Sequence, residues 1–175
     1  MTKRSAILGL LALLLTASAA DAQKGSRRLE LGIDGGITVG FDDPNVTIVS
    51  LPVQAFRVGF FMSDRVSLEP RFNFNSISGG GISVRTYALE LGALFHPGGY
   101  RTGSGLYIRP FAGVQGIGGD LGSDSDPFIG AGIGLKIPFA ERRFATRLEG
   151  NLGHAFNTGG STSLGILFGL SFFNR

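Results

Sequence analysis

The chain has 175 residues, of which 29 are glycine, with no cysteine, no tryptophan and a formal net charge of +3. The glycines follow no Gly-X-Y period, which excludes collagen, and a hydrophobic fraction of 43% excludes a disordered chain. Without cysteine there can be no disulfide, no thiolate metal site and no cysteine nucleophile. The length fits one domain. Because only 17% of the residues are charged and no stretch is densely basic, we expect no nucleic-acid partner.

Residues 1–22 have the pattern of a cleaved secretory signal peptide. Two basic residues, an apolar run over 6–15 and small residues at 20–22 follow one another in the expected order. The apolar run is shorter than the roughly 20 residues that a membrane-spanning helix needs. We therefore expect export and one mature domain over residues 23–175. That domain has no apolar run long enough for a membrane helix, so any membrane insertion must use strands.

Eight segments of the mature sequence alternate between apolar residues and polar or small ones. This period of two is typical of strands, because a helix cannot keep it on one face. The predicted strands cover about 29–39, 47–60, 65–76, 82–95, 106–116, 128–139, 144–156 and 162–173. These strands are longer than the ~5 to 6 residues usual in soluble sheets and match the ~9 to 11 that cross a bilayer. The sequence thus predicts an all-β, eight-stranded antiparallel up-and-down transmembrane barrel.

Two of the predicted strands have an irregular pattern. In the second, apolar residues change parity along the strand, so we expect a bulge near Gln54-Ala55 and a gap in the hydrogen-bond ladder at Pro52. In the fifth, the inward face is left open, because Leu106 and Ile108 compete with Tyr107 and Phe111 for the same side of the sheet.

Alternation alone does not decide whether the apolar face points inward, as in a secreted lipocalin-like barrel that binds a small ligand, or outward to lipid. The polar faces carry charges of both signs, which could pair inside a narrow lumen. We predict a lumen charge network of Glu30, Asp34, Glu69, Arg71, Glu90, Lys136, Arg147 and Glu149, with Arg57 and Arg109 on the same faces. Balanced charges favour the membrane barrel.

Glycines and phenylalanines support the same choice. Glycine shares the polar parity and would leave room for long charged side chains at positions 32, 36, 92, 130, 132, 134, 153, 165 and 169. Phenylalanines fall near both ends of the strands, as aromatic girdles do. One predicted girdle holds Phe60, Phe61, Phe95, Phe139, Phe144, Phe172 and Phe173, and the other holds Phe41, Phe72, Phe74, Phe128 and Phe156. The alternative is that these rings fill the core of a soluble sandwich.

The signal peptide, the eight alternating strands and the last strand, Leu164–Phe173, resemble the small OmpA/OmpX-type (porin-like) outer-membrane β-barrels over essentially all of the mature chain. In that family the aromatic closing strand is read by the barrel assembly machinery. The resemblance assigns this assembly signal to Phe168, Leu170, Phe172 and Phe173. The chain departs from the family pattern by adding two residues after the last phenylalanine.

Signals for chemistry at a specific site are few. Asp120, Asp124 and Asp126 place three carboxylates in a Gly/Ser loop, as a weak cation site would need, although the pattern favours a solvated acidic loop. The spacing lacks the closing Glu of an EF-hand. His154 lacks the serine two residues later that lipid A deacylase barrels carry. We expect no enzyme activity, no bound metal and no cofactor.

The sequence therefore predicts an exported, non-enzymatic outer-membrane barrel with a structural or surface-interaction role and a lumen closed by paired charges. Its expected partners are outer-membrane lipid, lipopolysaccharide and, during biogenesis, the assembly machinery. With the N-terminus in the periplasm, the external loops would be 42–46, 77–81, 117–127 and 157–161. A wide pore is disfavoured because it needs about 16 strands. A narrow ion-conducting barrel and the secreted ligand-binding barrel are the alternatives.

Overall fold

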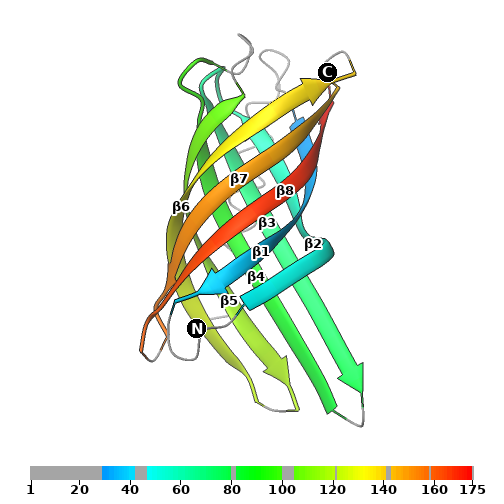
Figure 1. The fold of residues 1–175 in the computed structure, drawn as a ribbon, viewed down its shortest axis with the longest axis vertical. Coiled ribbons are helices and arrows are strands. Elements are labelled where there is room, and N and C mark those ends of the chain that lie inside the picture. The colour runs from blue at the N-terminus through cyan, green and yellow to red at the C-terminus, as the bar shows by residue number, and fades with distance from the viewer. Residues whose placement is uncertain are drawn as a thin grey trace, which may run out of the picture.

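The computed structural model describes residues 29–41, 47–79, 82–99, 105–120, 122–140, 143–157 and 159–174. They form one closed antiparallel barrel in which each strand pairs with the next and β1 pairs with β8 (Figure 1). The strands are β1 (Leu29–Gly40), β2 (Thr47–Phe61), β3 (Val66–Gly79), β4 (Ile82–Phe95), β5 (Leu106–Gly119), β6 (Asp124–Phe139), β7 (Phe144–Ala155) and β8 (Ser161–Asn174). The predicted up-and-down barrel is confirmed.

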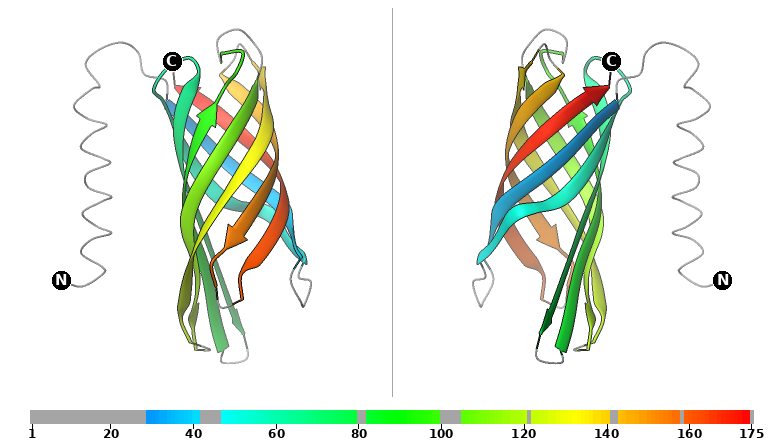
Figure 2. Two further views of the ribbon diagram at one scale, coloured as in Figure 1. Left: turned by 90° about the vertical axis from the view of Figure 1, so that its left-hand side faces the viewer. Right: turned by 90° about the vertical axis from the view of Figure 1, so that its right-hand side faces the viewer.

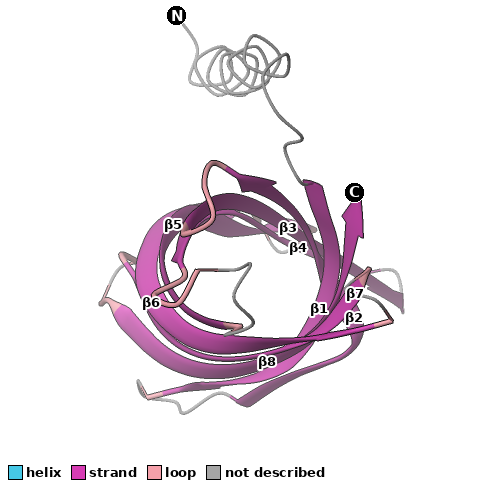
Figure 3. Ribbon diagram, turned by 90° about the horizontal axis from the view of Figure 1, so that it is seen from above, coloured by secondary structure: helices cyan, strands magenta, loops and turns pink. Residues whose placement is uncertain are grey.

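The barrel closes through a continuous ladder between the first and last strands. Leu29 is opposite Asn174 at one end of this ladder and Gly40 is opposite Ser163 at the other. Seen along its axis, the molecule is a ring of strands (Figure 3). No helix within the described ranges is long and apolar enough to cross a membrane. The expected signal peptide lies outside the described residues.

The two ends of the barrel differ in how far their hairpins extend. The start of β1 and the end of β8 lie at the same end as the turns after β2, β4 and β6 (Figure 2). At the opposite end, which we call the external end, the β3–β4 and β5–β6 hairpins reach farther than the other strands (Figure 1). The connections there are shorter than predicted, because β3 continues to Gly79, β5 to Gly119 and β6 starts at Asp124. Glycine and serine in these hairpins continue the ladder where the sequence favoured loops.

β2 contains the irregularity that its sequence predicts. Asp34 pairs with Ala55 and Gly36 with Ser50, so residues 51–54 of β2 are opposite the single residue Gly35 of β1. Pro52 lies in this bulge, where its missing N–H removes no regular ladder bond.

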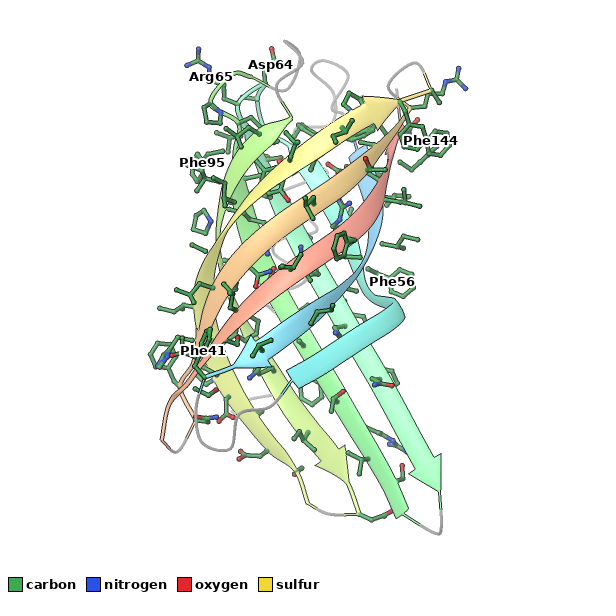
Figure 4. The ribbon with its side chains drawn as sticks, in the orientation of Figure 1. Phe41, Phe56, Asp64, Arg65, Phe95 and Phe144 are labelled. Atoms are coloured by element: carbon green, nitrogen blue, oxygen red, sulfur yellow. The ribbon has the colours of Figure 1, made fainter. Side chains whose placement is uncertain are left out.

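The barrel has an inverted distribution of polarity. Large apolar side chains are exposed on the outer surface of every strand, while the side chains with the least exposure are mostly charged. Figure 4 shows Phe95 and Phe144 near the end that carries Asp64 and Arg65, Phe41 towards the opposite end, and Phe56 between them. An apolar exterior around a polar interior is the reverse of a soluble ligand-binding barrel and is typical of a barrel surrounded by lipid.

Candidate functional site: the charged lumen

Ten charged side chains, five acidic and five basic, are buried inside the barrel. They are Glu30, Asp34, Arg57, Glu69, Arg71, Glu90, Arg109, Lys136, Arg147 and Glu149. Each lies on the inward parity of its strand. The structure therefore brings together all eight residues of the predicted network, together with Arg57 and Arg109. Burial of isolated charges is costly, so their mutual pairing decides whether this interior is stable.

One part of the network is centred on Arg57. Its Nε donates to both carboxylate oxygens of Asp34 at 3.0 Å, and its Nη1 donates to Glu30. Its Nη2 donates to the Ser171 hydroxyl at 2.7 Å. Glu30 in turn accepts a hydrogen bond from Lys136 Nζ at 2.6 Å. These contacts connect β1, β2, β6 and β8 across the lumen.

A second part is centred on Glu149. Arg109 Nη2 donates to this carboxylate at 2.6 Å, and Arg147 Nη2 and the Tyr107 hydroxyl donate to it as well. The same hydroxyl accepts a bond from Arg147 Nε at 2.5 Å. Arg147 Nη1 also donates to both oxygens of Glu69 at 2.7 and 2.8 Å. Since Glu69 lies 3.4 Å from Arg57 Nη1, the two parts form one network.

Arg71 is the most loosely bound cation of the network. Its four ion pairs, to Asp34, Glu69, Glu90 and Glu149, measure 3.3 to 4.0 Å. Its Nε and Nη2 make no hydrogen bond although they are buried. Arg71 and Glu90 are 8% and 9% exposed, whereas the other eight charged residues are at most 2% exposed. Arg71 and Glu90 are therefore the least deeply buried charges of the network.

Glycines on neighbouring strands leave the space that these side chains fill. A Cβ at Gly132 would lie 2.9 Å from Glu149 Oε1, and one at Gly92 would lie 2.9 Å from Arg109 Nη1. Both positions share the inward parity predicted for glycine. The narrow interior can hold ten long charged side chains because the residues opposite several of them have no side chain.

Aromatic rings cover the network at the end where β1 starts. Phe61 stacks on His96 at 6.2 Å and lies 6.3 Å from Phe173, while His96 is 5.9 Å from Tyr107. Lys136 Nζ lies 5.9 Å from the Phe61 ring and 5.5 Å from the Tyr107 ring. Burial, followed by the nearby Lys136 charge, lowers the pKa of His96 to about 4. His96 follows β4 directly, so this aromatic group sits at the mouth of the lumen.

Three phenylalanines assigned to the girdles face the interior instead. Phe61 and Phe173 belong to the aromatic group just described, and Phe128 packs edge-on against Phe111 at 6.2 Å. Phe173 is 4% exposed because it shares the inward parity of Ser171, whereas Phe168, Leu170 and Phe172 face outward. Within the residues assigned to the assembly signal, Phe173 thus lies on the opposite face of β8 from the other three.

The acidic residues Asp120 and Asp124 and the histidine His154 have local hydrogen-bond partners. Asp120 accepts a bond from the Ser83 backbone at 2.8 Å and Asp124 from that of Ser125 at 2.8 Å. Among the residues that the structure describes, no group of three His, Asp or Glu could hold a metal ion, so the acidic loop does not gather its carboxylates. His154 Nδ1 is 3.0 Å from the Thr162 hydroxyl, on the neighbouring strand.

Sequence reasoning left Tyr107 undecided and did not place Phe61 or His96 in the lumen. The parity of Tyr107 could have been fixed from Arg109, two residues later on the same strand, because an unpaired arginine is costly in lipid. His96 lies in a turn, where alternation gives no signal.

The fold has solved counterparts. Neisserial surface protein A (NspA) matches with a TM-score of 0.57 and 9% identity, over 82% of this chain and 96% of that one. Ail, the attachment invasion locus protein of Yersinia pestis, matches with a TM-score of 0.51 and 11% identity, over 86% of this chain and all of that one. The chain has the fold of the small OmpA/OmpX-type outer-membrane barrels. No protein-family model matches the chain, and no curated protein sequence does. The OmpA/OmpX-type fold is therefore recognisable in the arrangement of strands and not in conserved sequence.

Proposed function

We propose that the protein is a non-enzymatic integral outer-membrane barrel whose lumen is closed by the paired charges of the network. The inverted distribution of polarity carries this proposal, because the exposed apolar belt is stable only in lipid and the ten charges are stable only when paired. The likeness in fold to NspA and Ail supports an outer-membrane location. The outward apolar face argues against the secreted ligand-binding barrel.

Fractionation tests the location. We expect the protein to sediment with outer membranes, to require detergent for extraction and to migrate faster on gels before heating than after. Recovery in the soluble periplasmic fraction without detergent would reject a membrane barrel.

Closure of the lumen is tested separately in planar lipid bilayers. Eight of the charged residues in the lumen are at most 2% exposed, so we expect no steady conductance from the folded protein. A stable open channel in most insertions would favour the ion-conducting alternative.

For the surface role, we propose that the extended β3–β6 hairpins contact a partner outside the cell. Ail has been solved with a heparin analogue, sucrose octasulfate. We expect this chain to disfavour such polyanions, because Asp120 and Asp124 are exposed at the corresponding end. Binding of sucrose octasulfate at physiological salt, weakened in Arg85→Ala on β4, would contradict this expectation.

We also propose that the outward row Phe168, Leu170 and Phe172 on β8 is the part of the closing strand that the assembly machinery reads. Phe173 is excluded from this row because its ring packs inside the lumen.

A further inference from the structure

The wall of the barrel is incomplete between β2 and β3 at its external end. The last residue pair of their ladder is Ala55 with Asn73. Among the described residues, those of β2 before Ala55 have no partner on β3, and residues 74–79 of β3 pair only with β4. Figure 1 shows the two strands diverging here. We call this opening the β2–β3 seam; its β3 edge presents backbone N–H and C=O groups without a partner on β2.

The seam begins at the depth of the membrane interface. Phe74, the first β3 residue beyond the ladder, faces outward, is 54% exposed and pairs with Tyr87 on β4. Exposed aromatic side chains at the end of a lipid-facing row are typical of the boundary between hydrocarbon and head groups. A molecule in the seam would therefore lie partly in hydrocarbon and partly in a polar layer.

Unused hydrogen-bond donors lie on the lumen side of the seam. Arg71 is two residues from Asn73 on the same inward face of β3, and its Nε and Nη2 make no hydrogen bond. Its ion pairs of 3.3 to 4.0 Å are long for charge-assisted bonds, which are usually about 2.7 to 2.9 Å. Arg71 can thus donate to an incoming oxygen atom without first breaking a short ion pair.

An apolar surface lies on the lipid side of the same seam. Phe56 is directly opposite Phe72 across the β2–β3 ladder, and Phe74 follows on the same face. The three side chains are 63%, 47% and 54% exposed, respectively. They form a continuous strip that starts at the seam and runs along the lipid-facing surface, as an acyl chain would require.

We propose that the β2–β3 seam binds a single-chain amphiphile whose head group carries oxygen acceptors and no net charge. The head group accepts hydrogen bonds from Arg71 and Asn73, and the chain lies along Phe72 and Phe74. A single chain fits because Phe72 and Phe74 form one exposed row along β3, with Phe56 beside it across the ladder. An uncharged head group fits because the network already holds five acids and five bases, so an added charge of either sign would be unbalanced.

The test uses the full-length mature protein in phosphatidylcholine nanodiscs with monodecanoylglycerol as the probe. The chain has no cysteine, so one environment-sensitive fluorophore can be attached at Asn75→Cys beside the seam. The matched label is Asn151→Cys, on the inward face of β7 where both ladders are continuous. We expect the fluorescence of the label at position 75 to change saturably with the concentration of monodecanoylglycerol. The fluorescence of the label at position 151 should change only weakly and linearly, as expected for partitioning into the bilayer.

Variants separate the two halves of the site. Arg71→Gln should raise the half-saturating concentration by about tenfold, as expected for loss of a charge-assisted bond. Phe74→Ala should raise it by about fivefold, through lost apolar area. Phe95→Ala is the control and should change nothing, because Phe95 is 47% exposed on β4 and lies towards the opposite end of the barrel. Heat-dependent gel migration checks that each variant folds. If Arg71→Gln fails to fold, Phe74→Ala still tests the site, because Phe74 lies outside the charge network.

Several results would overturn the proposal. Equal, non-saturating changes at both labels would indicate bulk partitioning, and no change at either would mean that bulk phospholipid already fills the seam or that it is closed. An equal effect of Phe74→Ala and Phe95→Ala would remove the strip from the site. Decanoate binding as tightly as monodecanoylglycerol at neutral pH would reject the uncharged head group.

Discussion

Removing the Glu69 charge tests whether the lumen is held together by ion pairs. Glu69 accepts hydrogen bonds from Arg147 at 2.7 and 2.8 Å, and it lies 3.4 Å from Arg57 and 3.9 Å from Lys136. Arg71 lies 3.7 Å from Glu69 as well, so Glu69→Gln keeps the volume of the side chain but leaves four buried cations short of one negative charge. Loss of one partner from a buried ion pair costs about 3 to 5 kcal/mol. For a domain of this size, that corresponds to a fall of roughly 10 °C in the unfolding midpoint.

The midpoint is read from heat-dependent gel migration in one detergent at one pH. Asp124→Asn is the control, since Asp124 is exposed at the start of β6, and it should shift the midpoint by no more than about 1 °C. The double variant Glu69→Gln/Arg147→Gln restores charge balance, so its loss should be at least about 1 kcal/mol smaller than the sum of the single losses. If Glu69→Gln behaves like the control, or if the single losses simply add, the charges do not stabilise the lumen as argued.

Three further predictions concern packing, assembly and pH. Gly132→Ala should cost about 1 to 3 kcal/mol because its Cβ would lie 2.9 Å from a carboxylate oxygen of the network, whereas Gly118→Ala, with open space around it, should be neutral in the same melting assay. Phe172→Ala should lower the amount of protein assembled in the outer membrane, while Phe173→Ala should assemble normally but melt earlier; the opposite split would reject the outward-row assignment. His96 has a pKa of about 4 when folded against 6.5 for the free side chain, so the unfolded chain binds the extra proton between these values. The contribution of neutral His96 to the free energy of unfolding is complete above pH 6.5 and is lost as the pH falls through 4. The loss is about 2 kcal/mol with allowance for solvent screening. His96→Gln should therefore flatten the pH dependence of the unfolding midpoint across this window.

The architecture and most of the lumen could be predicted because strand alternation carries both at once. A period of two places Glu69 and Arg71 on one face and Leu68 and Phe72 on the other, and the structure keeps this division. Once the apolar face is assigned to lipid, every charged residue on the other parity must point inward. The same logic fails only for residues without a clear parity, such as His96 in its turn.

The remaining features depend on register, which alternation does not encode. Pro52 predicts a ladder gap but not that β2 loses β3 and keeps β1 beyond it. Phe173 shows a different limit: it shares the parity of Ser171, and neighbouring residues face opposite sides of a sheet, so Phe172 and Phe173 cannot form one outward signal. The neighbours Phe60 and Phe61 likewise lie on opposite faces of β2, so only one of them can belong to the outer girdle.

The position of the seam follows from the charges beside it. Arg57 on β2 is directly opposite Arg71 on β3, in the third pair from the external end of the ladder. Like charges in this arrangement destabilise a strand pair. Arg57 offsets this through short bonds to Asp34 and Glu30, whereas Arg71 has only long ion pairs. Pro70, which has no N–H to donate, weakens the same ladder on the other side of Arg71. The loosely bound Arg71 and the incomplete wall thus share one cause, which is the packing of five basic and five acidic side chains in a narrow barrel. The bases are paired least closely with acids at the β2–β3 interface.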